Sequence, residues 1–260
     1  MRAPIVAQFS LVIRRQMQRP YPLWRNTIPS AQADTTGRDS CSVGEHVPHR
    51  QTGSTMDLLY QTHSPYARKV LVFAQEAGLA AQLRVIHHET SPTNRNDQVF
   101  AVNPLGKVPV LVLADGEAIF DSVVICDYLE TFNKHAALIP AVGARRWAAL
   151  RMQAVAQGMC EAGIGLRWDT SRRPEHLRYP ALAEGMKTKL IESYDYLEQT
   201  TEFDEPLHVG HIAVATALDW LAFRDLPDFE TGRPRLSKWF REFLQRPSMQ
   251  ATPYDGETHD

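Results

Sequence analysis

The sequence predicts a small α/β sandwich domain that is followed by an all-α domain. From Asp57 onward the pattern reads strand, helix, strand, helix, strand, strand, helix over about 80 residues. A βαβ unit followed by a ββα unit folds into a mixed sheet covered by helices. Beyond Pro140 the apolar segments all have helical periodicity and none resembles a strand. This change in periodicity predicts the second domain.

Local signals predict the first βαβ unit. Residues 57–61 (DLLYQ) and 82–88 (QLRVIHH) read as short strands. Between them, Ser64 and Pro65 occupy positions where helices accept an N-cap and a proline. Gly78 follows the last apolar position, where a glycine commonly ends a helix. The stretch therefore predicts a strand, an amphipathic helix and a second strand.

The ββα unit follows a polar stretch that predicts a short helix or a loop. Residues 109–114 and 117–120 predict a hairpin, because an Asp-Gly turn signal lies between them. The next segment, DSVVICDYLETF, has helical periodicity. Asp121 or Ser122 is expected to cap this third helix.

Composition excludes several classes of function. The chain has 260 residues, is 43% hydrophobic and carries a formal net charge of -2, which gives no reason to expect a nucleic-acid partner. No apolar run approaches the roughly 20 residues of a membrane span, so we expect no membrane partner. The cysteines Cys41, Cys126 and Cys160 are far apart in the sequence. They indicate a reducing compartment, hence a cytoplasmic location, and no pair has the spacing of zinc ligands.

The first 55 residues differ from the rest of the chain. They contain seven arginines, no lysine and three acidic residues, and from Pro20 onward they lack any sustained apolar period. We expect residues 1–55 to be disordered, or to be upstream sequence translated from a start placed before Met56. The remaining boundaries are expected at 56–138 for the α/β domain, 139–255 for the helical domain and 256–260 for a tail.

A series of motifs runs along the chain, reading in order SPYARKV, NPLGKVPVL, FDSVVICDYLE, HVGHIAVATALDWLAFRDL and RPSMQAT. Together they resemble the cytosolic glutathione S-transferase family, and specifically a bacterial serine-type member. Each is weak alone, but their order and spacing from Met56 to about Pro253 are specific. The resemblance implies a thioredoxin-like N-terminal domain (βαβαββα) followed by an all-α helical-bundle domain, and glutathione as cosubstrate without a metal.

Pro109 raises a specific question, because a proline cannot donate to a strand ladder. Proline is tolerated at the first residue of a strand, which is one answer. The resemblance implies another, a cis Val108–Pro109 bond that aims the backbone of Val108 at the cysteinyl backbone of glutathione. Lys107 would then meet the glycyl carboxylate, or else be a solvated loop lysine.

Ser64 is the candidate catalytic residue that the resemblance implies. Lowering the pKa of a thiol from about 8.5 by about 2 units requires about 2.7 kcal/mol of preference for the thiolate. A hydroxyl hydrogen bond to a charged group supplies roughly 1.5–3 kcal/mol, and a helix N-terminus adds roughly 0.3–1 kcal/mol. Ser64 combines both effects. The alternative is a plain N-cap, and the two roles are expected to compete for one side chain.

Two neighbouring residues are rival donors to the thiolate. Tyr60 lies inside the first strand and is expected in the core, whereas His63 directly precedes Ser64 and could tune it. Relatives with cysteine in place of Ser64 tend towards disulfide exchange, because cysteine forms mixed disulfides. Serine therefore favours conjugation or thiol addition.

Asp121 and Ser122 begin the third helix, whose N-terminus favours anions. The resemblance implies that Ser122 binds the γ-glutamyl carboxylate and Asp121 its ammonium, the alternative being a plain helix cap. Many relatives carry Glu where this chain has Asp121. At the start of a later helix, His208 and His211 stand where relatives often carry a Ser/Thr-x-x-Asp capping box. The pair does not indicate a metal site, because no third ligand is evident in the sequence.

The resemblance implies a glutathione transferase, expected as a homodimer, that adds the thiolate to a small hydrophobic electrophile in detoxification. Two other classes stay open, because fold does not fix function. One is another glutathione-dependent enzyme, such as an isomerase or dehalogenase. The other is a non-catalytic glutathione-fold protein that binds ligands or a partner.

Overall fold

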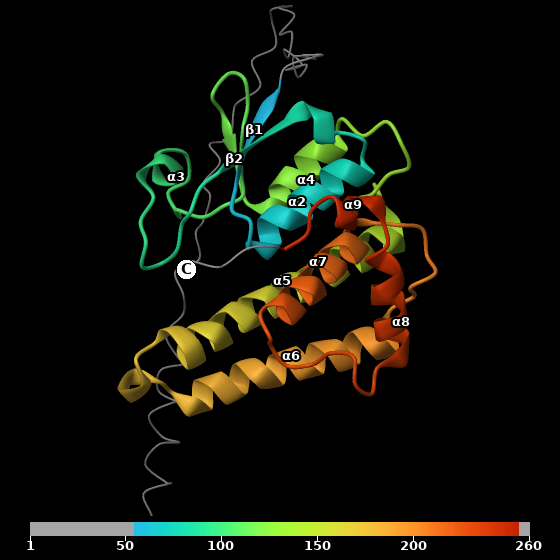
Figure 1. Ribbon diagram of the computed structural model, residues 1–260. Coiled ribbons are helices and arrows are strands. Elements are labelled where there is room, and N and C mark those ends of the chain that lie inside the picture. The colour runs from blue at the N-terminus through green and yellow to red at the C-terminus, as the bar shows by residue number, and fades with distance from the viewer. Residues whose placement is uncertain (1–54, 255–260) are drawn as a thin grey trace, which may run out of the picture. The chain divides into compact units, whose positions relative to one another are not determined.

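The computed structural model describes residues 55–254 and has the predicted architecture (Figure 1). A thioredoxin-like unit with a four-stranded mixed sheet comes first, and a helical region follows. Except for Thr55, the expected extension at 1–55 lies outside the described residues, as does the tail at 256–260. Within the described range, no helix is long and apolar enough to cross a membrane.

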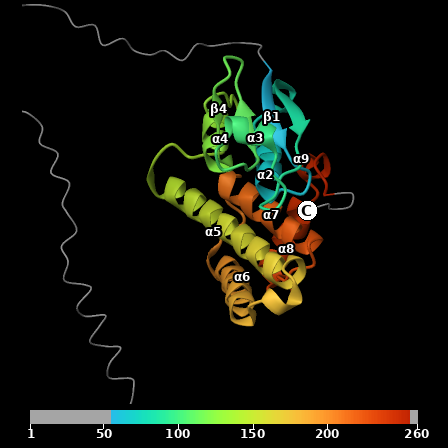
Figure 2. The same ribbon diagram turned by 90° about the vertical axis from the view of Figure 1, so that its left-hand side faces the viewer.

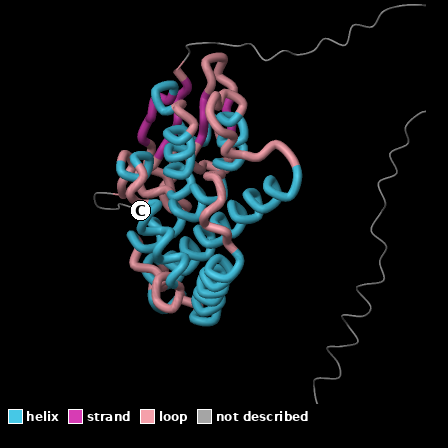
Figure 3. The backbone as a smooth tube through the Cα atoms, turned by 90° about the vertical axis from the view of Figure 1, so that its right-hand side faces the viewer, coloured by secondary structure: helices cyan, strands magenta, loops and turns pink. Residues whose placement is uncertain are grey.

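The sheet has the strand order β2-β1-β3-β4, and all four predicted strands are present within two residues at either end. The first strand is parallel to β2 and antiparallel to β3, which is antiparallel to β4. Their bounds are β1 (Met56–Tyr60), β2 (Leu83–His87), β3 (Val110–Val112) and β4 (Ala118–Ile119). Figure 3 shows these strands gathered in one part of the chain, with helices alone making up the other.

The sheet is covered on both faces, as a sandwich requires. Leu58 faces the core shared with α2 (Pro65–Glu76) and α4 (Ser122–Glu130), while its neighbour Leu59 packs with Val99 of α3 (Asp97–Val102). This alternation follows from the period of two along a strand. In Figure 1, α3 accordingly lies on the other side of the sheet from α2 and α4.

Strand directions bring three connections to one end of the sheet. Because β1 and β3 are antiparallel, with Leu59 opposite Val110, the end of β1 lies beside the start of β3. The hairpin then returns β4 to the same end, where Ile119 is opposite Leu111. The segments after β1, before β3 and after β4 therefore meet there.

The helical region is arranged around α7, whose residues are buried on nearly every side. The long helix α5 packs against both α6 and α7, and α7 also contacts α2 (Figure 2). The bounds are α5 (Gly143–Arg167), α6 (Pro180–Thr200), α7 (Val209–Phe223), α8 (Pro234–Phe243) and α9 (Pro247–Gln250). The expected domain boundary at 138/139 falls in the connection between α4 and α5 and stays a prediction.

Two histidines cap the start of α7 reciprocally. The Nδ1 atom of His208 accepts from the backbone N–H groups of Gly210 (3.1 Å) and His211 (3.4 Å), and Nδ1 of His211 accepts from the N–H of His208 (3.3 Å). The two buried rings stack with centroids 3.8 Å apart. Imidazoles thus replace the Ser/Thr and Asp of the usual capping box. Burial lowers the pKa of both histidines, that of His211 to about 4, which keeps them neutral acceptors.

Candidate active site

Ser64 is the N-cap of α2. Its backbone is extended and its Oγ accepts a hydrogen bond from the N–H of Ala67 at 3.2 Å, while Pro65 occupies the first helical position. A serine hydroxyl has two acceptor lone pairs and one proton to donate. The cap occupies a lone pair and leaves the proton, so the expected competition between capping and donation does not arise.

A cavity of about 140 Å³ opens beside Ser64, between the end of β1 and the helices α5 and α7. It is lined by Gln61, His63, Ser64, Pro65, Tyr66, Thr90, Ser91, Pro92, Ile164, Arg167, Trp168, Trp220 and Arg224. Ligand pockets commonly measure about 300–1,000 Å³. This cavity therefore suits the reacting end of a ligand whose remainder lies along the neighbouring surface.

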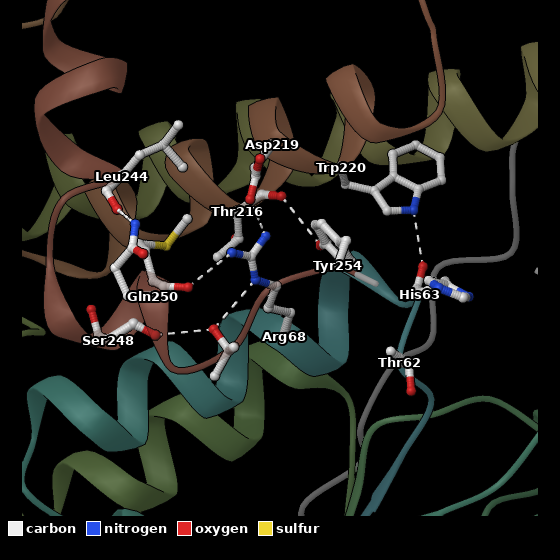
Figure 4. A network of polar contacts seen from close by, with 12 residues as sticks. Thr62, His63, Arg68, Thr216, Asp219, Trp220, Leu244, Ser248, Gln250 and Tyr254 are labelled. Atoms are coloured by element: carbon white, nitrogen blue, oxygen red, sulfur yellow. Dashed lines mark hydrogen bonds and ion pairs between the residues drawn. The ribbon is translucent and has the colours of Figure 1, made fainter. Parts of the chain in front are cut away.

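The residue before Ser64 is held by the helical region. The indole Nε1 of Trp220 donates to the backbone carbonyl of His63 at 2.9 Å (Figure 4). The His63 ring stacks on Phe223, with centroids 5.1 Å apart. Helix α7 thereby helps to fix the backbone that presents the Ser64 hydroxyl.

One turn further along α2, Arg68 anchors the helix. It is 1% exposed, pairs with Asp219 of α7 and donates to the hydroxyl of Thr252 and the carbonyl of Met249, both at 3.3 Å. Figure 4 shows this guanidinium beside the ring of Tyr254, whose centroid lies 4.2 Å from Cζ. These contacts tie α2 to the helical region from inside the core.

The rival donors differ in position. Tyr60 is buried as expected, with its hydroxyl 3.4 Å from the carbonyl of Thr62, and it does not line the described cavity. His63 does line it. So does Tyr66, which the sequence reasoning missed. Burial, with the negative charges near it, raises the pKa of Tyr66 far above its usual range. Its phenol therefore stays a neutral hydrogen-bond donor.

The Val108–Pro109 peptide bond is cis, in agreement with the prediction. The side chain of Val108 is buried in the small cluster formed with Leu59, Val99 and Val110. Only its backbone is therefore placed to meet a ligand. The Lys107 side chain is exposed, and its carbonyl accepts from Nδ2 of Asn103 at 2.8 Å.

The start of α4 has the features of an anion site. Asp121 is the N-cap, with Oδ1 accepting from the N–H of Val123 at 3.0 Å, and its Oδ2 lies 3.5 Å from Nε2 of Gln157. Ser122 is 1% exposed, and its Oγ has no hydrogen-bond partner among the described residues. An unpartnered buried hydroxyl at a helix N-terminus suits a carboxylate ligand.

A buried lysine, which the sequence reasoning also missed, lies behind these segments. Lys69 of α2 is 4% exposed and borders a second small cavity with Tyr66, Gln153 and Cys160. Burial lowers its pKa, an effect that the neighbouring Cys126, Asp121 and Cys160 oppose. Lys69 thus places a buried amine near Asp121, and burial shifts it towards its neutral form.

The structure therefore gathers the predicted residues at one end of the sheet without placing them all in one cavity. The turns that carry Ser64, Val108–Pro109 and Asp121–Ser122 meet there. Of the predicted residues, Ser64 lines the described cavity, while Lys107 lies on the exposed loop. Across residues 55–254, no group of three or more His, Cys, Asp or Glu side chains is placed to hold a metal ion.

Comparison with known proteins agrees with this arrangement. Residues 63–131 match the family model of the glutathione S-transferase N-terminal domain. The uncharacterised GST-like protein YibF of Escherichia coli (strain K12) is 30% identical over 202 residues, which cover 76% of this chain and 98% of YibF. The chain belongs to the glutathione S-transferase family.

Solved structures extend the likeness to the helical region. A glutathione transferase family member from Pseudomonas fluorescens Pf-5, with bound glutathione, superimposes with a TM-score of 0.75 at 32% identity, covering 78% of this chain and all of that protein. Its complex with S-(propanoic acid)-glutathione gives a TM-score of 0.72 at 32% identity, with 77% of this chain and all of that one covered. These relatives bind glutathione or a glutathione adduct in the fold described above.

Proposed function

We propose that this protein is a glutathione transferase in which the Ser64 hydroxyl donates a hydrogen bond to the glutathione thiolate. The observation that carries the proposal is the geometry of Ser64, which caps α2 through an oxygen lone pair, keeps its proton and lines a cavity. A hydroxyl donor and a helix N-terminus together supply free energy of the order needed to ionise a thiol at neutral pH.

The rest of glutathione would lie along the end of the sheet. The cysteinyl backbone would pair with the backbone of Val108 beside Pro109, as peptides add to sheet edges. The γ-glutamyl carboxylate would accept from the unpartnered Ser122 hydroxyl and the N-terminus of α4, with its ammonium at Asp121. Lys107 would reach the glycyl carboxylate.

The cosubstrate would be a small hydrophobic electrophile. Trp168, Trp220 and Ile164 give the cavity beside Ser64 an apolar wall. The thiolate sulfur forms a bond to the electrophilic carbon, and a leaving group departs or a double bond takes up a proton. The relative that binds S-(propanoic acid)-glutathione supports conjugation, because it accommodates a sulfur substituent. Ionising and positioning the thiol account for the rate gain, without a metal.

The oligomeric state, location and biological role that the resemblance implies are part of the same proposal. We expect a homodimer that acts in the cytoplasm in detoxification. The two described cysteines, Cys126 and Cys160, are free and buried, as suits a protein that needs no disulfide. Sedimentation of the purified chain tests the homodimer, because a single species of monomer mass would contradict it.

Titration of bound glutathione tests the role of Ser64. Ser64→Ala should raise the pKa of the bound thiol by about 1–2 units, from the roughly 1.5–3 kcal/mol of the lost hydrogen bond. Conjugation at pH 7 should fall by about tenfold or more and return in part at high pH, with little change in glutathione affinity. The measurement is thiolate absorbance against pH, with Ser64→Thr as the matched control that keeps a hydroxyl.

Coincident titrations of the wild type and Ser64→Ala would reduce Ser64 to a helix cap. Tyr66 and His63, which line the same cavity, would then be the donors to replace. Retention on immobilised glutathione without turnover of any electrophile would instead favour a glutathione-fold binding protein.

A further inference from the structure

The cavity beside Ser64 is bordered by a second hydroxyl, that of Tyr66. Tyr66 lies in the first turn of α2 and lines this cavity, and its hydroxyl makes no hydrogen bond to any residue that the structure describes. We propose that Tyr66 donates a hydrogen bond to a carbonyl oxygen of the electrophile, so that the preferred second substrate is a small α,β-unsaturated carbonyl compound. This inference rests on the proposed transferase function and names its substrate class.

Other neutral donors that line the cavity already have partners. They are Nε2 of Gln61, which donates to Glu89 at 2.7 Å, the hydroxyl of Thr90, which donates to the carbonyl of Gly106 at 2.8 Å, and Nε1 of Trp220, which donates to the carbonyl of His63 at 2.9 Å. The Ser91 hydroxyl lies 3.3 Å from that of Thr93. The Ser64 hydroxyl is assigned to the thiolate. Tyr66 is therefore the donor available to the electrophile.

The surroundings of Tyr66 suit a hydrogen-bond donor. Its ring packs against the core of the helical region, and burial is the largest cause of its raised pKa. A buried phenol usually has a hydrogen-bond partner, and an unpartnered one suits a ligand oxygen. Because this phenol holds its proton firmly, it stabilises a charged oxygen by hydrogen bonding rather than by giving the proton away.

Addition to an unsaturated ketone creates such an oxygen. The thiolate sulfur forms a bond to the β-carbon, the electron pair of the C=C bond shifts to the bond between the α-carbon and the carbonyl carbon, and the electron pair of the C=O bond passes to oxygen. The hydrogen bond from Tyr66 strengthens as this charge develops, so it favours the transition state over the ground state. A proton from solvent then returns to the α-carbon.

The cavity indicates a small electrophile. Its volume of about 140 Å³ is below the range of about 300–1,000 Å³ that is common for ligand pockets, and Ile164 and Trp168 contribute apolar contacts. A suitable probe is 3-buten-2-one. Its counterpart is 1-iodobutane, which transfers a chain of the same length without the oxygen, since the C–I bond breaks and iodide leaves with its electron pair.

The ratio of the two turnover rates tests the role of Tyr66. Tyr66→Phe keeps the ring and should lower kcat/KM for 3-buten-2-one about tenfold relative to kcat/KM for 1-iodobutane, the range of a hydrogen bond to a charged group. Ser64→Ala should lower both in proportion, because both reactions use the thiolate. Tyr196→Phe, at an exposed tyrosine on α6, is the matched control and should preserve the wild-type ratio.

Binding of the two products tests the contact apart from turnover. The products are S-(3-oxobutyl)glutathione and S-butylglutathione, which differ in the carbonyl oxygen. Tyr66→Phe should weaken binding of the oxobutyl conjugate relative to the butyl conjugate by about fivefold, as expected for one neutral hydrogen bond. Calorimetric titration of the wild type, Tyr66→Phe and Tyr196→Phe gives the dissociation constants.

Three results would overturn the inference. Tyr66→Phe could leave both ratios at their wild-type values, Tyr196→Phe could change them as much, or Tyr66→Phe could raise the pKa of the bound glutathione thiol, which would make Tyr66 a donor to the thiolate. If neither electrophile reacts while the ratio of the two affinities depends on Tyr66, the transferase proposal fails and the contact between Tyr66 and the carbonyl oxygen stands.

Discussion

Helices α2 and α7 both begin with a side-chain N-cap, but the two caps lie in different surroundings. Each has a side-chain cap at its first turn, a serine for α2 and a histidine pair for α7. Ser64 is partly exposed and lines a cavity, whereas His208 and His211 are buried, and the Nδ1 atom of each accepts from the backbone N–H of the other. Access to a cavity and an uncommitted proton, rather than capping itself, distinguish a candidate catalytic residue from a structural one.

The largest expected effect comes from placing a thiol at the first cap. Ser64→Cys should lower conjugation by about tenfold or more, the range of a hydrogen bond to a charged group, and should create thiol-transferase activity, because a mixed disulfide becomes possible. The measurement is turnover of an aryl halide beside reduction of a glutathione mixed disulfide. If Ser64→Cys conjugates at the wild-type rate and shows no disulfide exchange, the cap of α2 is structural, like that of α7.

Low pH should weaken the histidine cap of α7, because proton binding is coupled to unfolding. The pKa of His211 is lowered to about 4 in the folded state, from about 6.5 when unfolded, so the unfolded chain binds the additional proton. The contribution to stability is complete above pH 6.5 and declines as the pH falls towards 4, by about 3 kcal/mol at about 1.4 kcal/mol per pKa unit. Denaturant unfolding at a series of pH values measures the decline.

The matched control for this decline keeps the cap and removes the imidazoles. His208→Ser combined with His211→Asp restores a capping box whose carboxylate stays charged over most of that range. Its free energy of unfolding should depend less on pH between 6.5 and 4. An unchanged slope would locate the linked proton in another group.

A smaller effect is expected from truncating the α7 cap at neutral pH. His208→Ala should lower the free energy of unfolding by about 1 kcal/mol, the usual cost of a lost N-cap, while conjugation per folded molecule stays unchanged. Equilibrium unfolding and a specific-activity assay give the two numbers. A fall in specific activity larger than the fraction unfolded would show that this end of α7 also supports catalysis.

The smallest expected difference separates the two roles of Ser64. Ser64→Ala loses cap and donor, whereas Ser64→Gly loses the donor but costs the cap only a few tenths of a kcal/mol. Both should lose conjugation equally, while the alanine variant alone is destabilised by about 1 kcal/mol. A glycine variant as active as the wild type would assign catalysis to another residue.

Local chemistry predicted two parts of the site: Ser64 before Pro65 at the start of a helix, and a cap at Asp121 or Ser122, which the structure places at Asp121. The cis Val108–Pro109 bond was implied by the family resemblance rather than by the local sequence, and the structure contains it. Whether these residues bind glutathione stays a prediction.

The walls of the cavity were not predictable in that way. Trp220 contacts His63 across 157 positions of sequence, and Arg224 occupies a helix end without a motif. Such residues become neighbours only when the helical region packs on the sheet. Tyr66 was missed because it lies inside α2, after Ser64, rather than in the strand or turn before it.

The hydrogen bond from Trp220 to the carbonyl of His63 limits how this fold can be recombined. It joins the strand-to-helix turn of one half to the central helix of the other, immediately before the candidate catalytic serine. A chimera that joins this N-terminal half to the helical half of a relative would keep the Ser64 motif. The position of its Ser64 backbone would then depend on which residue the relative has in place of Trp220. Exchanging the two halves as independent modules would therefore change the position of the Ser64 hydroxyl, unless the exchanged helical half also has a tryptophan at the position of Trp220.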